Sequence, residues 1–436
     1  MHHHDKRQLA QAAAAVVGVD AGKFHHVLVV RPRGRRDSKP LQFPTTRPGF
    51  DDALAFIREQ AGSAAGVGDG QLLVGIEFAG RYGFTLAHYL RETDERIQIV
   101  SVLPAHTKRW KEVTHHQPLK TDAKDALGIT DLTAQGHFVR FPFLAPAYAE
   151  LRSLLSTREK LSTLRRGVIA RLRTTLDVVF PEFTTLFVSP VKKTARTLLR
   201  EYPGPEDLRA APRRAVLALL RRESRNHLGR EMYDGLLEAA AHTIALPSAQ
   251  GATKDEIPLL IERLDLYESQ MRRIEHAMQH HLSVLPAARA LLTIPNVAPV
   301  TAAVFLGSLG DPKAYDSSRE ILALAGLTLV ERSSGILKGE KRISKRGRPV
   351  LRKHAHMFAV RSVHKDGIFR REYEALLARN GHKTIPALTA IARRGLRLLY
   401  AVARSERPWT AERPAERPGE KSRVIEPGTG AAEGKV

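Results

Sequence analysis

The feature that most constrains the fold is a change of hydrophobic period near residue 150. Between residues 15 and 145, short β-branched runs alternate with segments of helical spacing, as in VVGV at 16–19, VLVV at 27–30 and QLLVGIE at 71–77. Strands that alternate with helices predict a largely parallel or mixed sheet covered on both faces. After Glu150 the apolar residues recur every three or four positions. The sequence therefore predicts an α/β domain followed by helical regions.

Two apolar stripes predict long helices in the second part of the chain. The first runs from Leu151 to Val179 and ends at Pro181, and the second runs from Leu260 to Leu285 with coiled-coil spacing. Two such amphipathic helices would pair with each other or with those of another protomer. The intervening residues 185–250 read as short helical pieces from which we infer no chemistry.

The patterns divide the chain into five parts. They are an N-terminal extension (1–14), the α/β domain (15–147), a helical and coiled-coil region (148–286), a mainly α-helical C-terminal domain (287–406) and a tail (407–436). The tail has almost no apolar residues, which predicts disorder. Near the start of the C-terminal domain, LLTIPNVAPVTAAVFLGSLGDP is typical of a helix-hairpin-helix, with Asn296 and Ala298 where glycines are usual.

The charge of the chain favours a polyanionic partner. There are 69 Lys and Arg against 46 Asp and Glu, a formal net charge of +23, so nucleic acid is the default partner. An anionic membrane surface is the other option, but no apolar run approaches the roughly 18 residues of a spanning helix. No secretory signal is recognisable, and a cytoplasmic location fits. Because cysteine is absent, any metal must be held by carboxylates or histidines.

Four acidic residues stand where a metal site would need them. Asp20 and Glu77 each end a predicted strand, and Asp122 and Asp125 share one face of a predicted helix. Any one of them alone is usually a turn, cap or surface residue. Together they favour a site for Mg²⁺, which takes oxygen ligands. Two such ions, about 3.5–4 Å apart, would suit phosphodiester cleavage.

A serine pair and a basic run occur together in the C-terminal domain. Ser333 and Ser334 precede Gly335, and a series of basic residues follows: Lys338, Lys341, Arg342, Lys345, Arg346, Arg348, Arg352 and Lys353. Such a run binds phosphate, and its cations would stabilise the charge that develops if a serine attacked phosphorus. The residues alone leave open whether this is only a phosphate-binding loop or also carries a nucleophile.

The first long helix carries a second group of cations: Arg152, Arg158, Lys160, Arg165, Arg166, Arg171 and Arg173. These residues either solvate the helix or bind DNA or RNA through salt-sensitive phosphate contacts. Few acidic residues accompany them, Glu159 being the main exception, which favours nucleic-acid binding.

Five separated motifs, in order, resemble one family. They are GVDAGKFHHVLVV, GIEFAGRYGFTLAHYL, KTDAKDA, IPNVAPVTAAVFLGSLGDPKAYDSSREILALAGL and ERSSGILKGEKRISKRGRPVLR. The chain resembles the DEDD transposases of insertion-sequence family 110, also called the Piv/MooV type. The resemblance implies a RuvC-like, RNase H-type domain with the acids Asp20, Glu77, Asp122 and Asp125, then a coiled-coil connector and a C-terminal transposase domain.

The resemblance also implies the chemistry and the partners. It places a catalytic serine at Ser334, or at Ser333 if the match shifts by one residue. It implies Mg²⁺, a serine-linked DNA intermediate, and double-stranded DNA at the element junction and target. It further implies guidance by a structured noncoding bridge RNA, a dimer or a dimer of dimers with a composite active site, and a prokaryotic, nucleoid-associated location.

Two other functions remain open on the sequence alone. A Holliday-junction resolvase would use RuvC-type acids with water as nucleophile, and would need neither the serine pair nor its basic run. A non-catalytic nucleic-acid-binding relic of a transposon is the third reading, although all four acids and the serine are present.

Overall fold

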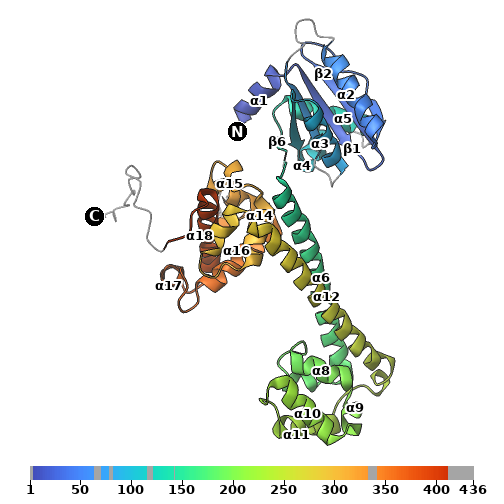
Figure 1. The fold of residues 1–436 in the computed structure, drawn as a ribbon, viewed down its shortest axis with the longest axis vertical. Helices are drawn as coiled ribbons and strands as arrows, with labels where there is room; N and C mark the ends of the chain where they lie inside the picture. Colours follow the sequence, from blue (N-terminus) through green and yellow to red (C-terminus); the bar gives the residue numbers. More distant parts are fainter. Residues whose placement is uncertain are drawn as a thin grey trace, which may run out of the picture. The chain divides into compact units, whose positions relative to one another are not determined.

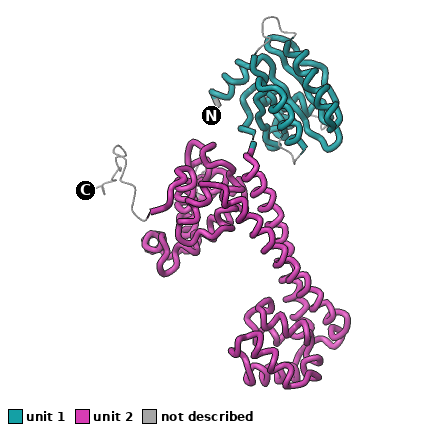
Figure 2. Tube along the Cα trace, viewed as in Figure 1, with its two compact units in different colours: residues 1–143 teal, residues 144–436 magenta. Residues whose placement is uncertain are grey.

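The computed structural model describes residues 3–62, 70–77, 82–114, 121–141, 143–331 and 341–410. The chain forms two compact units, residues 1–143 and 144–436 (Figure 2). Ser333, Ser334, Lys338 and most of the predicted tail, 411–436, lie outside the described residues. In the described part of the chain, no helix is both long and apolar enough to cross a membrane.

The N-terminal unit is built on a mixed sheet, as predicted. The strands that the structure describes are β1 (Ala15–Ala21), β2 (His25–Pro32), β3 (Leu41–Pro44), β4 (Leu72–Glu77), β5 (Ile97–Val102) and β6 (Val139–Arg140), in the order β3-β2-β1-β4-β5-β6. β1, β4 and β5 are parallel neighbours, and the other pairs are antiparallel. The short strands β3 and β6 were not predicted.

Helices cover both faces of this sheet (Figure 1). They are α1 (His3–Ala12), α2 (Arg47–Gly62), α3 (Tyr82–Thr93), α4 (Pro104–Thr114) and α5 (Asp122–Ala134). Val17 and Val74 belong to the core that α2 and α3 cover, whereas Val16 and Leu73 pack with α1, α4 and α5. Alternate strand residues point to opposite faces, so Gly18 and Asp20 of β1 face α5.

Glycines allow α5 to lie unusually close to the two central strands. A Cβ atom on Gly18 would lie 2.3 Å from the backbone nitrogen of Thr130, and one on Gly75 would lie 2.0 Å from Thr133 Oγ1. The Thr130 and Thr133 hydroxyls donate hydrogen bonds to carbonyls one turn earlier in α5, to Ala126 and Ile129. Their polar groups are therefore satisfied inside a glycine-lined contact.

The second unit is organised around two long antiparallel helices, α6 (Pro146–Val179) and α12 (Ala252–Ser283), which pack side by side (Figure 1). Between them in sequence lie α7 (Phe183–Leu186), α8 (Lys193–Glu201), α9 (Pro205–Ala210), α10 (Arg213–Ser224), α11 (Arg230–Ala241) and the 3₁₀ turn Pro247–Ala249. The short helices share a core with the C-terminal end of α6 and the N-terminal part of α12. The two helices thus pair with each other within one chain, which is one of the two pairings that the sequence left open.

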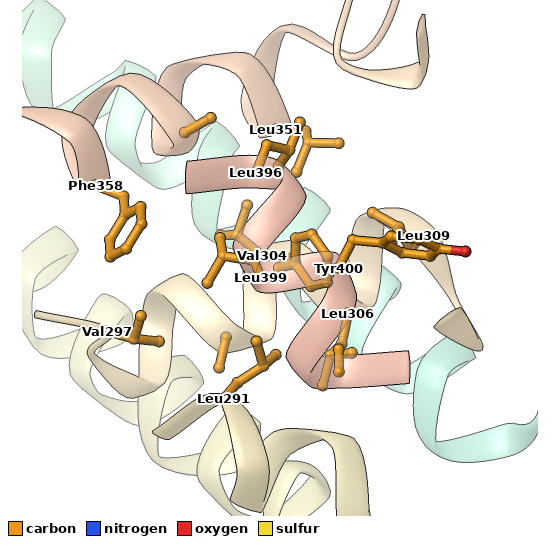
Figure 3. Close-up of a cluster of buried hydrophobic side chains, with 14 of the residues drawn as sticks. Leu291, Val297, Val304, Leu306, Leu309, Leu351, Phe358, Leu396, Leu399 and Tyr400 are labelled. Carbon is orange, nitrogen blue, oxygen red and sulfur yellow. The ribbon is translucent and has the colours of Figure 1, made fainter. Parts of the chain in front are cut away.

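The rest of this unit forms a second helical core. Its elements are α13 (Pro286–Leu292), α14 (Pro299–Leu309), the 3₁₀ turn Pro312–Ala314, α15 (Ser318–Leu324), β7 (Leu329–Glu331), β8 (Lys341–Ile343), α16 (Pro349–Ser362), α17 (Arg370–Arg379) and α18 (Thr384–Ser405). Val304, Phe358 and Leu399 lie at its centre (Figure 3). Leu151 of α6 and Leu282 of α12 belong to the same core.

Two local features of this core differ from a purely helical expectation. The antiparallel pair β7–β8 flanks residues 332–340 and was not predicted. In the connection from α13 to α14, Asn296 has a φ of 66°. Asparagine tolerates this left-handed conformation better than most residues, which accounts for a helical hairpin without the usual glycines.

We predict that Gly18→Ala destabilises the N-terminal unit by about 1–3 kcal/mol or more, because the added methyl group meets the backbone of α5 rather than a movable side chain. Gly62→Ala is the matched control, since a Cβ atom there has no neighbour within 4 Å. Chemical denaturation of the full chain checks this. Equal stability of the two variants would show that the close approach of α5 is not required.

Candidate functional site

Two acidic residues lie side by side at the C-terminal ends of the neighbouring central strands β1 and β4. β1 and β4 are parallel, and Val19 pairs with Ile76 in their register. Asp20 and Glu77 are the next residues on each strand, so their side chains leave the same face of the sheet. This is the face that α5 covers.

The other two acidic residues come from the first turn of α5. The Thr121 side chain caps this helix by accepting a hydrogen bond from the backbone N–H of Lys124, which fixes the helix start at Asp122. Asp125 is buried and Asp122 is exposed. All four predicted acids line one pocket of about 400 Å³, together with Pro104, Thr107, Lys108 and Lys111.

The carboxylates act on one another electrostatically. Burial, followed by the negative charges of Asp125, Glu77 and Asp122, raises the pKa of Asp20 from 3.8 to about 6, while the Lys111 ammonium acts in the opposite direction. An acidic group whose pKa rises in this way is one whose charge lacks full compensation. The pocket therefore favours cations.

Helix α4 contributes residues that the sequence analysis missed. Lys111 Nζ lies 2.6 Å from Asp125 Oδ1, and the Thr107 hydroxyl donates a hydrogen bond to Glu77 Oε1. Lys108 also lines the pocket. A signal was present, because Lys108 and Lys111 are three residues apart in the segment that follows β5 and so can share one face of a helix. The sequence alone did not show that this segment packs beside the ends of β1 and β4, so the two lysines were not connected with the acids.

The donor set fits a hard divalent cation. Asp125 Oδ1 is buried and receives no well-directed hydrogen bond, although the Lys111 ammonium is close. Carboxylate oxygens are the ligands that Mg²⁺ prefers. In the described residues, no group of three or more acidic or histidine side chains has the geometry of a formed metal site. An ion would therefore have to draw the carboxylates together.

The cations of α6 have partners that the sequence analysis did not foresee. Arg158 pairs with Glu275, Arg165 with Glu268 and Arg171 with Glu256, each at 2.7 Å, and all three acids belong to α12. The expectation that these arginines lack acidic partners is therefore wrong. Arg166 is exposed and contacts Ser162 and Thr163 of its own helix. A role of Arg165, Arg166 and Arg171 in nucleic-acid binding remains a prediction.

The basic run of the C-terminal domain divides into exposed and structural residues. Arg342, Lys345 and Arg346 are exposed. Arg348 donates to the carbonyl of Ser308, and Arg352 donates to the carbonyls of Ala325 and Lys345. Lys341 lies in β8, but its side chain, like Lys338 and Ser334, is outside what the structure describes.

We predict that Asp20→Asn stabilises the metal-free protein at pH 7.5. The raised pKa of Asp20 means that the folded state binds this proton more tightly than the unfolded chain. Wild-type stability should therefore fall as the pH rises from about 4 to 6, and the gain from Asp20→Asn should appear above pH 6 and vanish near pH 4.

Thermal unfolding in chelator at the two pH values measures this effect. Asp131→Asn, on helix α5 of the same unit, is the control: Asp131 pairs with Arg31 at 2.7 Å, so its loss should lower stability at pH 7.5. An Asp20→Asn protein that is less stable than wild type at pH 7.5 would contradict the electrostatic account of the pocket.

Two separate segments of the chain match known protein families. Residues 17–181, which contain all four acids, match the DEDD transposase domain of the IS110 family. Residues 288–374 match the transposase domain of the IS116/IS110/IS902 family. Together the two segments cover more than half of the chain.

Insertion-element proteins are similar over nearly the whole length. A 43.6 kDa protein of insertion element IS110 from Streptomyces coelicolor is 25% identical over 92% of this chain and 96% of its own. A 44.8 kDa protein of IS116 from Streptomyces clavuligerus is 25% identical over 91% and 96%. The transposase of IS1328 from Yersinia enterocolitica is 32% identical over 30% of this chain and 40% of its own. Because the two segments that match this family cover more than half of the chain, the chain belongs to the IS110 family of DEDD transposases and is a DNA-recombining enzyme.

Proposed function

We propose that this chain catalyses transposition of an insertion sequence, cleaving and rejoining DNA strands with Mg²⁺ held by Asp20, Glu77, Asp122 and Asp125. The observation that carries the proposal is the convergence of these four acids, from two strands and one helix, on a single pocket. The raised pKa of Asp20 supports it, because burial and the three neighbouring carboxylates both disfavour the charged form, and Lys111 offsets only part of this.

The arrangement of the sheet supports a RuvC-like, RNase H-type fold for this domain. The first three strands are antiparallel neighbours, and β1 then pairs in parallel with β4, giving the order β3-β2-β1-β4-β5. In the second unit, the antiparallel packing and the ion pairs of α6 and α12 support a coiled-coil connector.

The residues at the metal site would have different roles. Asp125 Oδ1 is the most buried candidate ligand, and Thr107 holds Glu77 by its hydrogen bond. Lys111 neutralises part of the cluster before an ion binds. When bound, divalent ions stabilise the charge that develops on the attacking and leaving oxygens.

Ser334 is the proposed nucleophile, with Ser333 as the alternative. Its hydroxyl would lose a proton and form a bond to phosphorus, while one P–O bond of the DNA backbone breaks and the leaving oxygen takes up a proton. Because ester is exchanged for ester, no external energy source is needed to rejoin the strands. This step rests on the sequence motif, since residues 332–340 lie outside the described residues.

The partners follow from the same resemblance. We propose double-stranded DNA at the element junction and target, a structured bridge RNA as guide, and a dimer or tetramer in which acids and serine of different protomers combine. The net charge of +23 supports polyanionic partners. The nucleoid of a prokaryotic cell is the proposed location.

A covalent-trapping assay tests the proposal. The protein, with Mg²⁺ and co-purified RNA, is incubated with labelled DNA carrying the element junction and analysed on a denaturing gel. We expect wild type to form a protein–DNA adduct, Ser334→Ala to form none, and Ser333→Ala to form it normally. Asp125→Asn should bind the DNA but neither cleave it nor form the adduct, because it lacks a metal ligand.

Each contrary result has a distinct meaning. Cleavage without an adduct, unaffected by either serine change, would support the resolvase with water as nucleophile. Full activity of Asp125→Asn, or of wild type in excess chelator, would contradict the metal site. Binding without cleavage under all conditions would support the non-catalytic relic.

A further inference from the structure

A second pocket, of about 760 Å³, is formed by α6, α14, the start of α16 and Arg348, the residue that precedes α16. Its walls are largely aliphatic, with Leu155 and Leu164 from α6 and Val350 from α16. Arg152 and Arg348 also line it. The pocket shares no residue with the carboxylate site. It brings together Arg152 and Lys160 from the cations of α6 and Arg348 from the basic run, two groups for which the sequence separately predicts phosphate contacts.

The two arginines are held side by side by the end of α14. Arg152 donates from Nε to the carbonyl of Gly307 at 2.9 Å and from Nη2 to that of Ser308 at 3.1 Å. Arg348 donates from Nη1 to the same Ser308 carbonyl at 2.5 Å. Because both guanidinium groups bind one oxygen atom, they are close neighbours. Each keeps further N–H groups that bind none of the described residues.

No carboxylate compensates these two charges in the described part of the chain. Glu159 lines the pocket, but its ion contacts are with Lys353 at 3.0 Å, Arg158 at 3.5 Å and His354 at 3.5 Å. Burial and the neighbouring Arg348 lower the pKa of Arg152 to about 10, and burial lowers the pKa of Arg348. Both shifts show that the charged forms are destabilised where they stand.

An uncompensated pair of partly buried cations is costly for a fold. The negative end of the α14 dipole offsets part of this cost. An anion in the pocket would offset more of it, because a guanidinium can present two parallel N–H groups to a phosphate. The exposed Lys160, on the rim, would add a third positive charge.

We propose that Arg152, Arg348 and Lys160 form a binding site for a phosphodiester group in the backbone of a nucleic-acid strand. The pocket is much larger than one phosphate group, and its aliphatic wall leaves room for the attached sugar. The inference rests on the proposed nucleic-acid-binding function and adds a specific subsite to it. DNA and RNA share the phosphodiester chemistry, so the experiment must separate them.

The test measures the salt dependence of binding by the full chain. The probes are a short fluorescein-labelled duplex DNA of arbitrary sequence, a single-stranded RNA of equal length, and inorganic phosphate as competitor. For the probe that uses the site, Lys160→Gln and Arg348→Gln should each weaken binding roughly three- to tenfold near 0.1 M salt. Each should also reduce the slope of log affinity against log salt by about one.

Arg404→Gln is the matched control. Arg404 also donates to backbone carbonyls, those of Tyr315 and Asp316, and its loss removes the same charge, but it does not line the pocket. Lys160 is exposed and makes no ion pair among the described residues, so its variant should fold normally even if Arg348→Gln does not. Arg348→Lys keeps the charge, and we expect it to retain most of the slope while losing stability.

The outcomes separate the subsite from the function. A reduced slope with DNA, with RNA or with both supports the site and identifies which nucleic acid supplies the phosphodiester group. A slope changed no more by Lys160→Gln and Arg348→Gln than by Arg404→Gln would overturn the site while leaving nucleic-acid binding intact. If inorganic phosphate competes with the probe but the two pocket variants keep the salt slope of wild type, the site is also overturned. No binding of either nucleic acid by wild type would contradict the proposed function itself.

Discussion

The close approach of α5 to the central strands brings Asp122 and Asp125 to the two strand-end carboxylates, Asp20 and Glu77. Gly18 and Gly75 lie two residues before Asp20 and Glu77 on the same face of the sheet, and they leave room for Thr130 and Thr133 of α5. With α5 against this face, its first turn reaches the ends of β1 and β4. The packing brings negative charges together, and the raised pKa of Asp20 reflects the electrostatic cost. The clustered carboxylates lower the stability of the metal-free fold, and the same clustering allows the site to bind cations.

Positive charge in the second unit has more than one role. Arg158, Arg165 and Arg171 join α6 to α12 and so stabilise the long helical pair. Arg152 and Arg348 bind the carbonyl end of α14 and have no acidic partner among the described residues. The difference lies in their partners rather than in their sequence context. The count of 69 lysines and arginines therefore overstates the number of cations available to nucleic acid, whereas the net charge of +23 already deducts their acidic partners.

Sequence patterns predict the regular elements well because burial imposes their periods. The strands carrying Asp20 and Glu77, the helix carrying Asp122 and Asp125, and both long helices follow from local spacing. The register that aligns Asp20 with Glu77 depends on pairing between distant strands, and Lys111 depends on where α4 packs. The acidic partners of Arg158, Arg165 and Arg171 are 85 to 117 residues away in sequence, so no local charge count could find them.

The most direct test of the central claim is a crystal structure of the full-length protein grown with Mn²⁺, which replaces Mg²⁺ at oxygen sites and gives an anomalous signal. The account predicts anomalous density among Asp20, Glu77, Asp122 and Asp125. Density only at other sites, or none at saturating Mn²⁺, would contradict it.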